Sequence, residues 1–289
     1  MVELPAGSLL PAGPGRPRVG LGWRAPLAGW VASQPPEVEC LELVAEHFFA
    51  SGQELLAELG ARWPVFVHGL GLSLGSPGPL DPHDLARFAR VAELTRAAWV
   101  SEHVAFTRTA QVDLGHLCPV APTRQNVERI ASHARQVADA CGRPVLLENI
   151  TSHLRLQGEL DEPEFLNAVC ERGGCGLLLD VTNLYVNARN HRFDPLRWLH
   201  ALEGARIRQL HVVGYAREQG RLEDHHGHDL QPELLDLVQA ACAHGAVEAV
   251  VLERDAHIPA PAHLREELLR VRASLMAPVA PSAGGRAWS

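Results

Sequence analysis

The sequence predicts a single-domain α/β protein with the architecture of a TIM-type (β/α)8 barrel, and three features support this fold. Eight short apolar runs alternate with stretches of helical period along the chain. Runs such as VLLEN and GLLLD are apolar without alternation, as expected of parallel strands covered on both faces. The units recur at roughly 30 to 45 residues and most runs end in polar residues, which favours a closed barrel over an open sheet.

The predicted elements follow one another in strict order. The strands are Val19–Arg24, Cys40–Ala45, Val65–Leu70, Trp99–Phe106, Val145–Asn149, Gly176–Asn183, Ile207–Val213 and Ala249–Glu253. The helices are Gln53–Ala61, Pro82–Ala97, Arg124–Cys141, Glu162–Arg172, Pro195–Glu203, Gln231–His244 and Pro261–Met276. Pro82, Pro195 and Pro232 each follow an Asp or Gln, where proline is tolerated at a helix start.

The length of 289 residues fits one barrel domain, since such barrels commonly run to about 250 residues. We assign residues 18–276 to the barrel. The Pro/Gly-rich segment 1–17 and the tail 277–289 are expected to be unstructured extensions.

Composition narrows the class of partner. Hydrophobic residues make up 46% and charged residues 21%, as in soluble globular proteins. A net charge of -8 argues against nucleic acid as the main partner. The sequence shows neither a signal peptide nor the roughly 18 apolar residues of a membrane span, so we expect a cytoplasmic protein without membrane contact. The six cysteines form no CxxC pair and are expected to be free thiols.

Six of the eight runs end in a residue that can bind a metal. These residues are His68 in VFVHG, His103 in WVSEH, Glu148 in VLLEN, Asp180 in GLLLD, His211 in IRQLH and Glu253 in AVVLE. In a closed parallel barrel the carboxyl ends of the strands converge on one mouth, so the six side chains should form a cluster. A single histidine there is more often structural, and for Glu148 a cation is the simplest compensation for burial, with an arginine partner as the alternative. Six together favour a metal centre.

Three more candidate ligands lie beyond the strand ends. Asn183 follows Asp180 by three residues, although a neutral amide is a poor ligand and Asn is common in turns. Asp224 and His226 are the chosen pair in EDHHGHD, which we predict to be a loop after the seventh strand. A histidine-rich surface loop without metal is the alternative.

Two acids are candidate catalytic residues that would support the ligands. Glu102 precedes His103 and is expected to orient an imidazole. Asp255 lies two residues after Glu253 and is a candidate base or supporting group.

The nine candidate ligands exceed the needs of one ion. Catalytic zinc takes three protein ligands, and a facial-triad iron takes two histidines and one carboxylate, so the set suits two or three ions. Imidazole and carboxylate together suit iron, manganese or zinc and do not separate them.

The motifs HGLGLSLG, SEH, LLENITSHL, LLLDVTNLYVNARNH, LHVVGYAREQGRLEDHHG and LERDAHIP closely resemble those of one family. It is the DUF692 family of multinuclear non-heme iron-dependent oxidases, which includes the methanobactin biosynthesis oxidase. The resemblance runs from about Val19 to the helix after Pro259. It implies a barrel that holds two or three irons, in mixed Fe(II)/Fe(III) states, and uses O2 to modify ribosomally made precursor peptides, often at cysteine.

By position, the resemblance places metal ligation on His68, His103, Glu148, Asp180, His211, Asp224, His226 and Glu253. At Asn183 some relatives have histidine and others asparagine. In LELVAEHFF the residues Glu42 and Glu46 match the family, whereas His47 replaces its usual asparagine. The resemblance also implies a separate partner that recognises the leader part of the peptide, and a homodimer, since relatives often pair.

Two other functions compete with this interpretation. A multinuclear zinc hydrolase or isomerase of the endonuclease IV or xylose isomerase type builds similar sites on the same barrel. A metal store without catalytic activity would instead fill every coordination position with protein groups.

Overall fold

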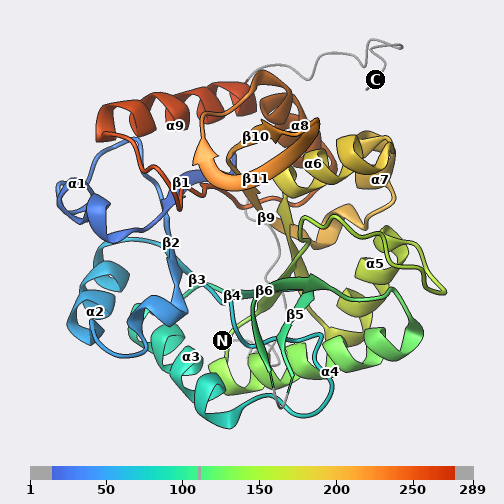
Figure 1. Ribbon diagram of the computed structural model, residues 1–289. Coiled ribbons are helices and arrows are strands. Elements are labelled where there is room, and N and C mark those ends of the chain that lie inside the picture. The colour runs from blue at the N-terminus through green and yellow to red at the C-terminus, as the bar shows by residue number, and fades with distance from the viewer. Residues whose placement is uncertain (1–14, 110–111, 277–289) are drawn as a thin grey trace.

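The computed structural model describes residues 15–109 and 112–276, and it confirms the predicted barrel. Eight parallel strands close in the order β1-β12-β9-β8-β7-β4-β3-β2, surrounded by helices (Figure 1). Residues 1–14 of the predicted N-terminal extension and the predicted tail 277–289 lie outside the described residues. The barrel strands are β1 Arg18–Gly22, β2 Leu41–Val44, β3 Val65–His68, β4 Val100–His103, β7 Val145–Glu148, β8 Gly176–Asp180, β9 Ile207–Val212 and β12 Ala249–Leu252.

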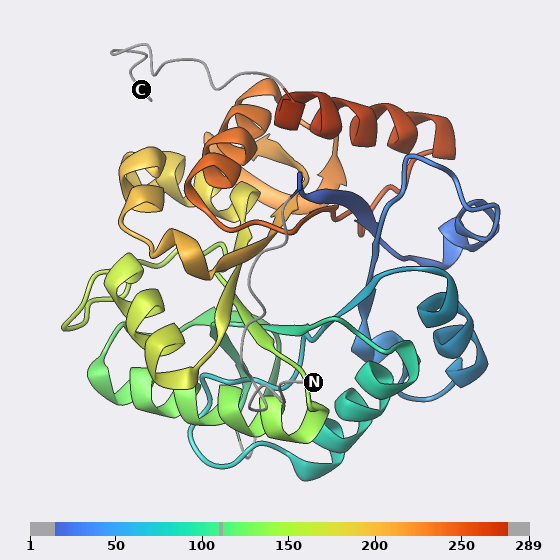
Figure 2. The same cartoon turned by 180° about the vertical axis from the view of Figure 1, so that it is seen from behind.

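The helices form a ring around these strands, as the view from behind also shows (Figure 2). They are α1 Ala28–Ala32, α2 Gln53–Arg62, α3 Pro82–Thr95, α4 Arg124–Cys141, α5 Glu162–Gly173, α6 Val181–His191, α7 Pro195–His200, α8 Pro232–His244 and α9 Pro261–Met276. Short 3-10 helices span Ala25–Leu27, Ala45–Phe48 and Gly204–Arg206. No helix among the described residues is long and apolar enough to cross a membrane.

The predicted strand Gly176–Asn183 is wrong in its last three residues. Strand β8 ends at Asp180, and α6, which the sequence analysis did not predict, begins at Val181. The Asp180 side chain accepts a hydrogen bond from the Asn183 backbone N–H at 2.7 Å and thereby caps the helix. The β-branched residues Val181 and Thr182 extend the apolar run and conceal this start.

Two hairpins rise from the same end of the barrel, and both were missed (Figure 1). The predicted strand Trp99–Phe106 is divided into β4 and the first strand of a hairpin, β5 Ala105–Arg108 with β6 Asp113–Pro119. The EDHHGHD segment belongs to a strand rather than a loop, in the hairpin of β10 Gly214–Glu218 with β11 Arg221–His228. Its turn residues Gln219 and Gly220 both have positive φ, as short hairpin turns require.

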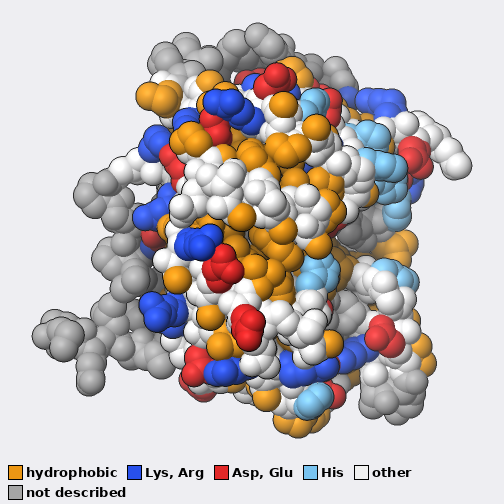
Figure 3. Space-filling view, turned by 90° about the vertical axis from the view of Figure 1, so that its left-hand side faces the viewer, with side chains coloured by type: hydrophobic (Ala, Val, Ile, Leu, Met, Phe, Trp, Pro, Cys, Tyr) orange, Lys and Arg blue, Asp and Glu red, His pale blue; other side chains and the backbone are white. Residues whose placement is uncertain are grey.

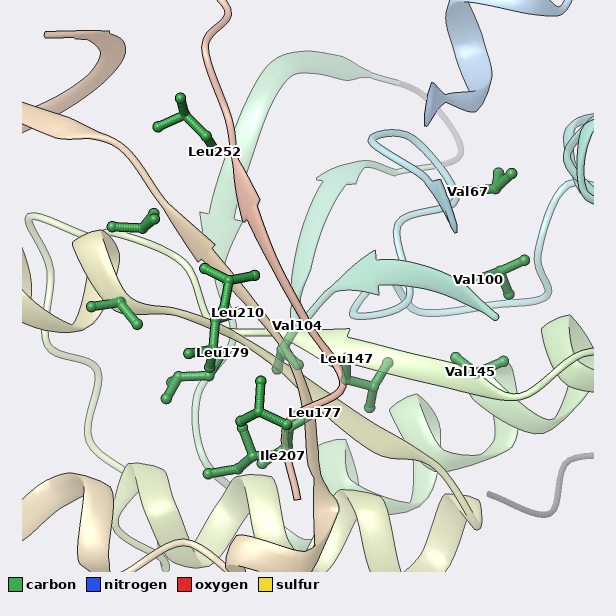
Figure 4. Packing of buried hydrophobic residues seen from close by; sticks show 14 of the residues in the cluster. Val67, Val100, Val104, Val145, Leu147, Leu177, Leu179, Ile207, Leu210 and Leu252 are labelled. Atoms are coloured by element: carbon green, nitrogen blue, oxygen red, sulfur yellow. The ribbon is translucent and has the colours of Figure 1, made fainter. Parts of the chain in front are cut away.

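Alternation along the strands sorts side chains into an outer and an inner layer. Val145 and Leu147 of β7 and Leu177 and Leu179 of β8 belong to the outer layer under the helices (Figure 4). The inner layer fills the barrel with Cys40, Phe66, Trp99, Leu146, Leu178, Ala249 and Val251. The barrel is therefore packed below its mouth, and whatever side chains come next on the inner face of each strand must meet there.

Candidate metal centre

The strand-end candidates occupy the layer directly above the apolar filling. Phe66, Leu146, Leu178 and Val251 of the inner layer precede His68, Glu148, Asp180 and Glu253 by two residues each. A spacing of two returns a side chain to the same face of a strand, so all these residues face the barrel interior at its mouth. Glu253 was predicted to end the eighth strand, but β12 ends at Leu252 and Glu253 is the next residue.

The first group combines two imidazoles with one carboxylate. His68, His103 and Glu148 are buried, and their ligand atoms all lie within 4.8 Å of one another. The Nε2 atoms of His68 and His103 are each 3.4 Å from Oε2 of Glu148. All three side chains thus face one point between β3, β4 and β7.

The second group shares Glu148 with the first. The members of this group, Glu148, Asp180, His211 and Glu253, are all buried. Their ligand atoms also lie within 4.8 Å of one another. Nδ1 of His211 lies 3.2 Å from Oε1 of Glu148 and 3.0 Å from Oε2 of Glu253. Glu148 therefore presents one oxygen to each group, which is the arrangement of a bridging carboxylate.

The third group shares Asp180 with the second and takes its other members from the hairpin. Asp180, Asp224 and His226 meet within 4.8 Å, and His226 Nε2 lies 2.9 Å from Asp224 Oδ2. His226 has the left-handed φ of 51°, which is uncommon for a residue other than glycine. A fourth, overlapping group joins His226 to Glu253 and Asp255.

Four buried atoms of this cluster have no hydrogen-bond partner among the described residues. They are Oε2 of Glu148, Oδ2 of Asp180, Nδ1 of His211 and Nδ1 of His226. Each unsatisfied buried polar atom costs about 1–3 kcal/mol, more when it is charged. Cations placed between the groups would satisfy all four atoms, so the residues fit a centre of two or three ions.

The charges of the cluster lead to the same conclusion. Burial lowers the pKa of His211, but the surrounding carboxylates more than reverse this and hold the pKa well above its ordinary value. Burial raises the pKa of Asp180 well above its ordinary value, and the charges of Asp224 and Glu148 raise it further. The carboxylates therefore carry more negative charge than the histidines balance, and metal cations between the groups would supply the missing positive charge.

A buried polar chain below the cluster fixes His211, and the sequence analysis did not assign it to the site. Oε1 of Glu42 lies 2.7 Å from Nε2 of His211, while Oε2 accepts a hydrogen bond from Gln209 Nε2. Trp99 Nε1 donates to Gln209 Oε1 at 2.6 Å and so sets the orientation of the amide. Glu42 therefore directs Nδ1 of His211 toward the proposed ions. The only sequence signal was its match to the family motif.

Similar contacts orient the other imidazoles. Ser101 Oγ lies 2.9 Å from Nδ1 of His68, which leaves Nε2 for a metal. Glu102 Oε1 accepts the backbone N–H of His103 at 2.8 Å and lies 3.3 Å from its Nδ1, the position expected of an orienting acid. Oε2 of Glu102 accepts the Leu72 N–H at 2.9 Å.

Asp255 stands at the edge of the cluster, with 43% of its side chain exposed. Its Oδ2 is 3.1 Å from Nδ1 of His226, and its Oδ1 accepts from Nε of the buried Arg24 at 2.6 Å. This position suits either a base or a supporting group, and both roles of Asp255 stay predictions.

Asn183 and the remaining histidines of EDHHGHD lie outside the four groups. The Asn183 amide is engaged with protein, because Nδ2 donates to the Asn149 carbonyl and Oδ1 accepts from Thr151 Oγ1. Ligation by Asn183 stays a prediction. His225 and His228 are exposed to solvent. Figure 3, a side view, shows histidine side chains gathered along its right-hand edge, the face seen frontally in Figure 1.

Comparisons with known proteins identify the family of this chain. A sequence model of the family described as "RiPP precursor modification enzyme MbnB/TglH/ChrH" matches residues 18–276. A UPF0276 protein of Rhizorhabdus wittichii is 34% identical over 262 residues, covering 89% of this chain and 94% of that protein. A UPF0276 protein of Bordetella pertussis is 36% identical over 282 residues, covering 94% and 97%.

Solved structures share the fold at low identity. Endonuclease IV from Thermus thermophilus aligns with a TM-score of 0.58 at 20% identity, covering 90% of this chain and 99% of that chain. D-psicose 3-epimerase from Clostridium cellulolyticum aligns with a TM-score of 0.56 at 14% identity, covering 89% and 96%. These likenesses establish the TIM-barrel fold alone, whereas the family match covers nearly every described residue. The chain belongs to the MbnB/TglH/ChrH family of RiPP precursor modification enzymes.

Proposed function

We propose that this protein is an O2-dependent oxidase with two or three non-heme irons in mixed Fe(II)/Fe(III) states. Its proposed substrate is a ribosomally synthesised precursor peptide, modified at a cysteine or at the C-terminal residue. The observation that carries the proposal is the linked set of ligand groups in which Glu148 and Asp180 are each shared between two groups. Carboxylates shared in this way would hold neighbouring ions close enough to act on one substrate group.

The donor set supports the choice of metal. All members of the four groups at the mouth are imidazoles or carboxylates, a combination that suits iron and leaves manganese and zinc as competitors. Membership of a precursor-modifying family supports a peptide as the substrate. When bound, the irons would supply the electron-transfer chemistry that lets O2 react with a peptide side chain.

The protein's own residues hold and shield the site. Glu42 and Ser101 fix the ring orientations of His211 and His68, so that little reorganisation is needed when ligands bind. The inner ligands are almost fully buried, whereas 24% of the His226 side chain is exposed. Substrate therefore approaches from the side of the hairpin.

Asp255 lies on this exposed side and is suited to accept a proton from the substrate. Its Oδ2 is directed at His226, and the guanidinium of Arg24 balances its charge. Burial raises the pKa of Asp255, but its close contact with His226 and the charge of Arg24 reverse this, and the net shift is downward. Asp255 is therefore ionised near neutral pH, the form in which a carboxylate can accept a proton.

The proposal includes partners and a compartment. The described chain is occupied by the barrel, its helices and two hairpins, so leader recognition is assigned to a separate protein. A homodimer and a cytoplasmic location also belong to the proposal, the latter supported by six free cysteines. Nucleic acid and membrane are not among the proposed partners.

A zinc hydrolase or isomerase is the second candidate, because endonuclease IV and the epimerase share the fold. The test is to load the protein anaerobically with ferrous iron or with zinc and to measure O2 consumption with the co-expressed precursor peptide. The oxidase predicts peptide-dependent O2 uptake with iron and none with zinc. Phosphodiesterase or sugar isomerase activity of the zinc form, without O2 uptake by the iron form, would establish the rival.

A further inference from the structure

A cavity of about 790 Å³ lies beside the metal centre, bounded by the end of β6, the loop 151–160, α5 and α7. Its inner wall includes Val104 and Asn149, which directly follow the candidate ligands His103 and Glu148. The cavity thus begins one residue away from two proposed ligands. Its volume falls within the range of about 300–1,000 Å³ that is typical of ligand sites.

The lining of the cavity combines apolar and polar side chains. Its lining includes the side chains of Ile150, Phe165, Leu166, Phe193 and Trp198. Polar side chains, among them Asn187, His191 and Arg197, also line it. A ligand that carries both apolar side chains and polar backbone groups, as a peptide does, therefore fits this lining.

The rim of the cavity exposes apolar side chains, together with backbone groups that make no hydrogen bond to other backbone groups of the described chain. Leu154 and Leu156 on the loop expose 63% and 38% of their surface, although most leucines of the described chain are buried. Among the described residues, segment 155–159 takes part in no backbone–backbone hydrogen bond and contains neither helix nor strand. The loop projects outward beside α5 in both ribbon views (Figures 1 and 2). It therefore offers both apolar surface and free backbone groups.

We propose that this cavity and its rim bind an extended, apolar stretch of the precursor peptide adjacent to the residue that is modified. The peptide backbone pairs with that of Arg155–Gln157, and one or more apolar side chains enter the cavity. This inference rests on the proposed function for the peptide substrate, but it needs neither iron nor O2. It assigns sequence selectivity to the enzyme itself, in addition to any partner that binds the leader.

A second pocket, of about 430 Å³, lies on the other side of the β5–β6 hairpin and serves as a comparison. Its arginines Arg87 and Arg108 are both paired with Asp84, so its charges are largely matched within the protein. Leu70 lines this pocket and exposes 39% of its surface. A Leu70 variant therefore controls for the loss of an exposed leucine near the mouth.

The test uses two series of capped, fluorescein-labelled peptides with a single cysteine. One series carries leucine and phenylalanine at varied distances from the cysteine, and the other carries serine at the same positions. Fluorescence anisotropy gives affinity, and hydrogen–deuterium exchange reports on loop 151–160. We expect at least one apolar spacing to bind about tenfold more tightly than its serine counterpart and to slow exchange in segment 155–157.

Three variants localise the binding. Leu156→Ser at the rim and Ala201→Trp at the wall should each weaken it about tenfold, whereas Leu70→Ser should leave it unchanged. Circular dichroism and urea unfolding verify that each variant is folded. Equal binding of both peptide series, or full affinity in Ala201→Trp, would overturn the proposal, as would a loss in Leu70→Ser equal to that in Leu156→Ser.

Measuring binding in His211→Ala separates this inference from the oxidase. Peptide binding retained there, together with absent O2 chemistry in the iron-loaded parent protein, would uphold the cavity and reject the oxidase. O2 uptake with the co-expressed precursor that is unaffected by Ala201→Trp would reject the cavity and uphold the oxidase.

Discussion

Replacing Glu42 with glutamine tests whether the buried chain below the centre controls metal binding. The carboxylate accepts from two donors, the ring N–H at Nε2 of His211 and the amide of Gln209. Gln209 cannot turn over, because Trp99 Nε1 donates to its oxygen. In Glu42→Gln the new amide has one acceptor oxygen for two donors. Whichever way the amide is turned, its NH2 group therefore faces either the ring N–H of His211 or the amide NH2 of Gln209.

The size of the effect follows from this geometry. A lost charge-assisted hydrogen bond at a buried site costs about 1.5–3 kcal/mol, which corresponds to about 10–100-fold in metal affinity. Affinity for Fe(II) or Zn(II) is measured by competition with a chromophoric chelator, and bound metal by inductively coupled plasma mass spectrometry. Glu58→Gln, on the exposed face of α2, is the matched control and should bind like the parent protein.

A swap makes the test more specific. In the double variant Glu42→Gln/Gln209→Glu, the carboxylate is at position 209 and the amide at position 42. The carboxylate accepts hydrogen bonds from Trp99 and from the amide NH2 group. The amide oxygen accepts the hydrogen bond from His211. The hydrogen-bond pattern is then restored, and we expect most of the lost metal affinity to return. Unchanged affinity in Glu42→Gln, or a double variant weaker than the sum of both single changes, would refute the reasoning.

Further predictions concern the ligands and the metal-free state. His211→Ala should lose iron and turnover while circular dichroism shows a folded barrel, and full activity would exclude a ligand role. Glu148→Ala should lower the metal-to-protein ratio by more than His226→Ala does, because Glu148 is almost fully buried between two groups whereas 24% of the His226 side chain is exposed; equal ratios would contradict the bridging role. Burial lowers the pKa of His103, but Glu148 and Glu102 more than reverse this and raise it to about 9. The protonated His103 therefore stabilises the folded state fully below about pH 6.5, and this stabilisation is lost as the pH rises through 9. The melting temperature of the metal-free protein should therefore fall between pH 6.5 and 9, and that of the metal-bound protein should change less.

The sequence predicts the barrel and the placement of its strand-end residues well, for a physical reason. Residues such as Glu148 and Asp180 end buried runs, and a closed parallel barrel brings all carboxyl ends of its strands to one rim. Their convergence therefore follows from topology once the fold is assigned. Their mutual distances follow from side-chain alternation above the apolar inner layer.

Other features depend on contacts that a linear pattern does not contain. Glu42 and Gln209 meet across 167 residues of sequence, and nothing local marks Glu42 as a partner of His211. Helix α6 was missed because Val181 and Thr182 have strand-like side chains, although Asp180 caps the helix. The β10–β11 hairpin was predicted as a loop because its composition suggested metal binding and masked the turn at Gln219.

Anomalous X-ray diffraction at the iron edge, from crystals loaded anaerobically with ferrous iron, tests the central claim most directly. The account predicts two or three iron peaks at the barrel mouth, one between His68, His103 and Glu148 and one beside His211, with Glu148 joining them. An iron-free mouth, or iron bound only elsewhere on the molecule, would contradict it.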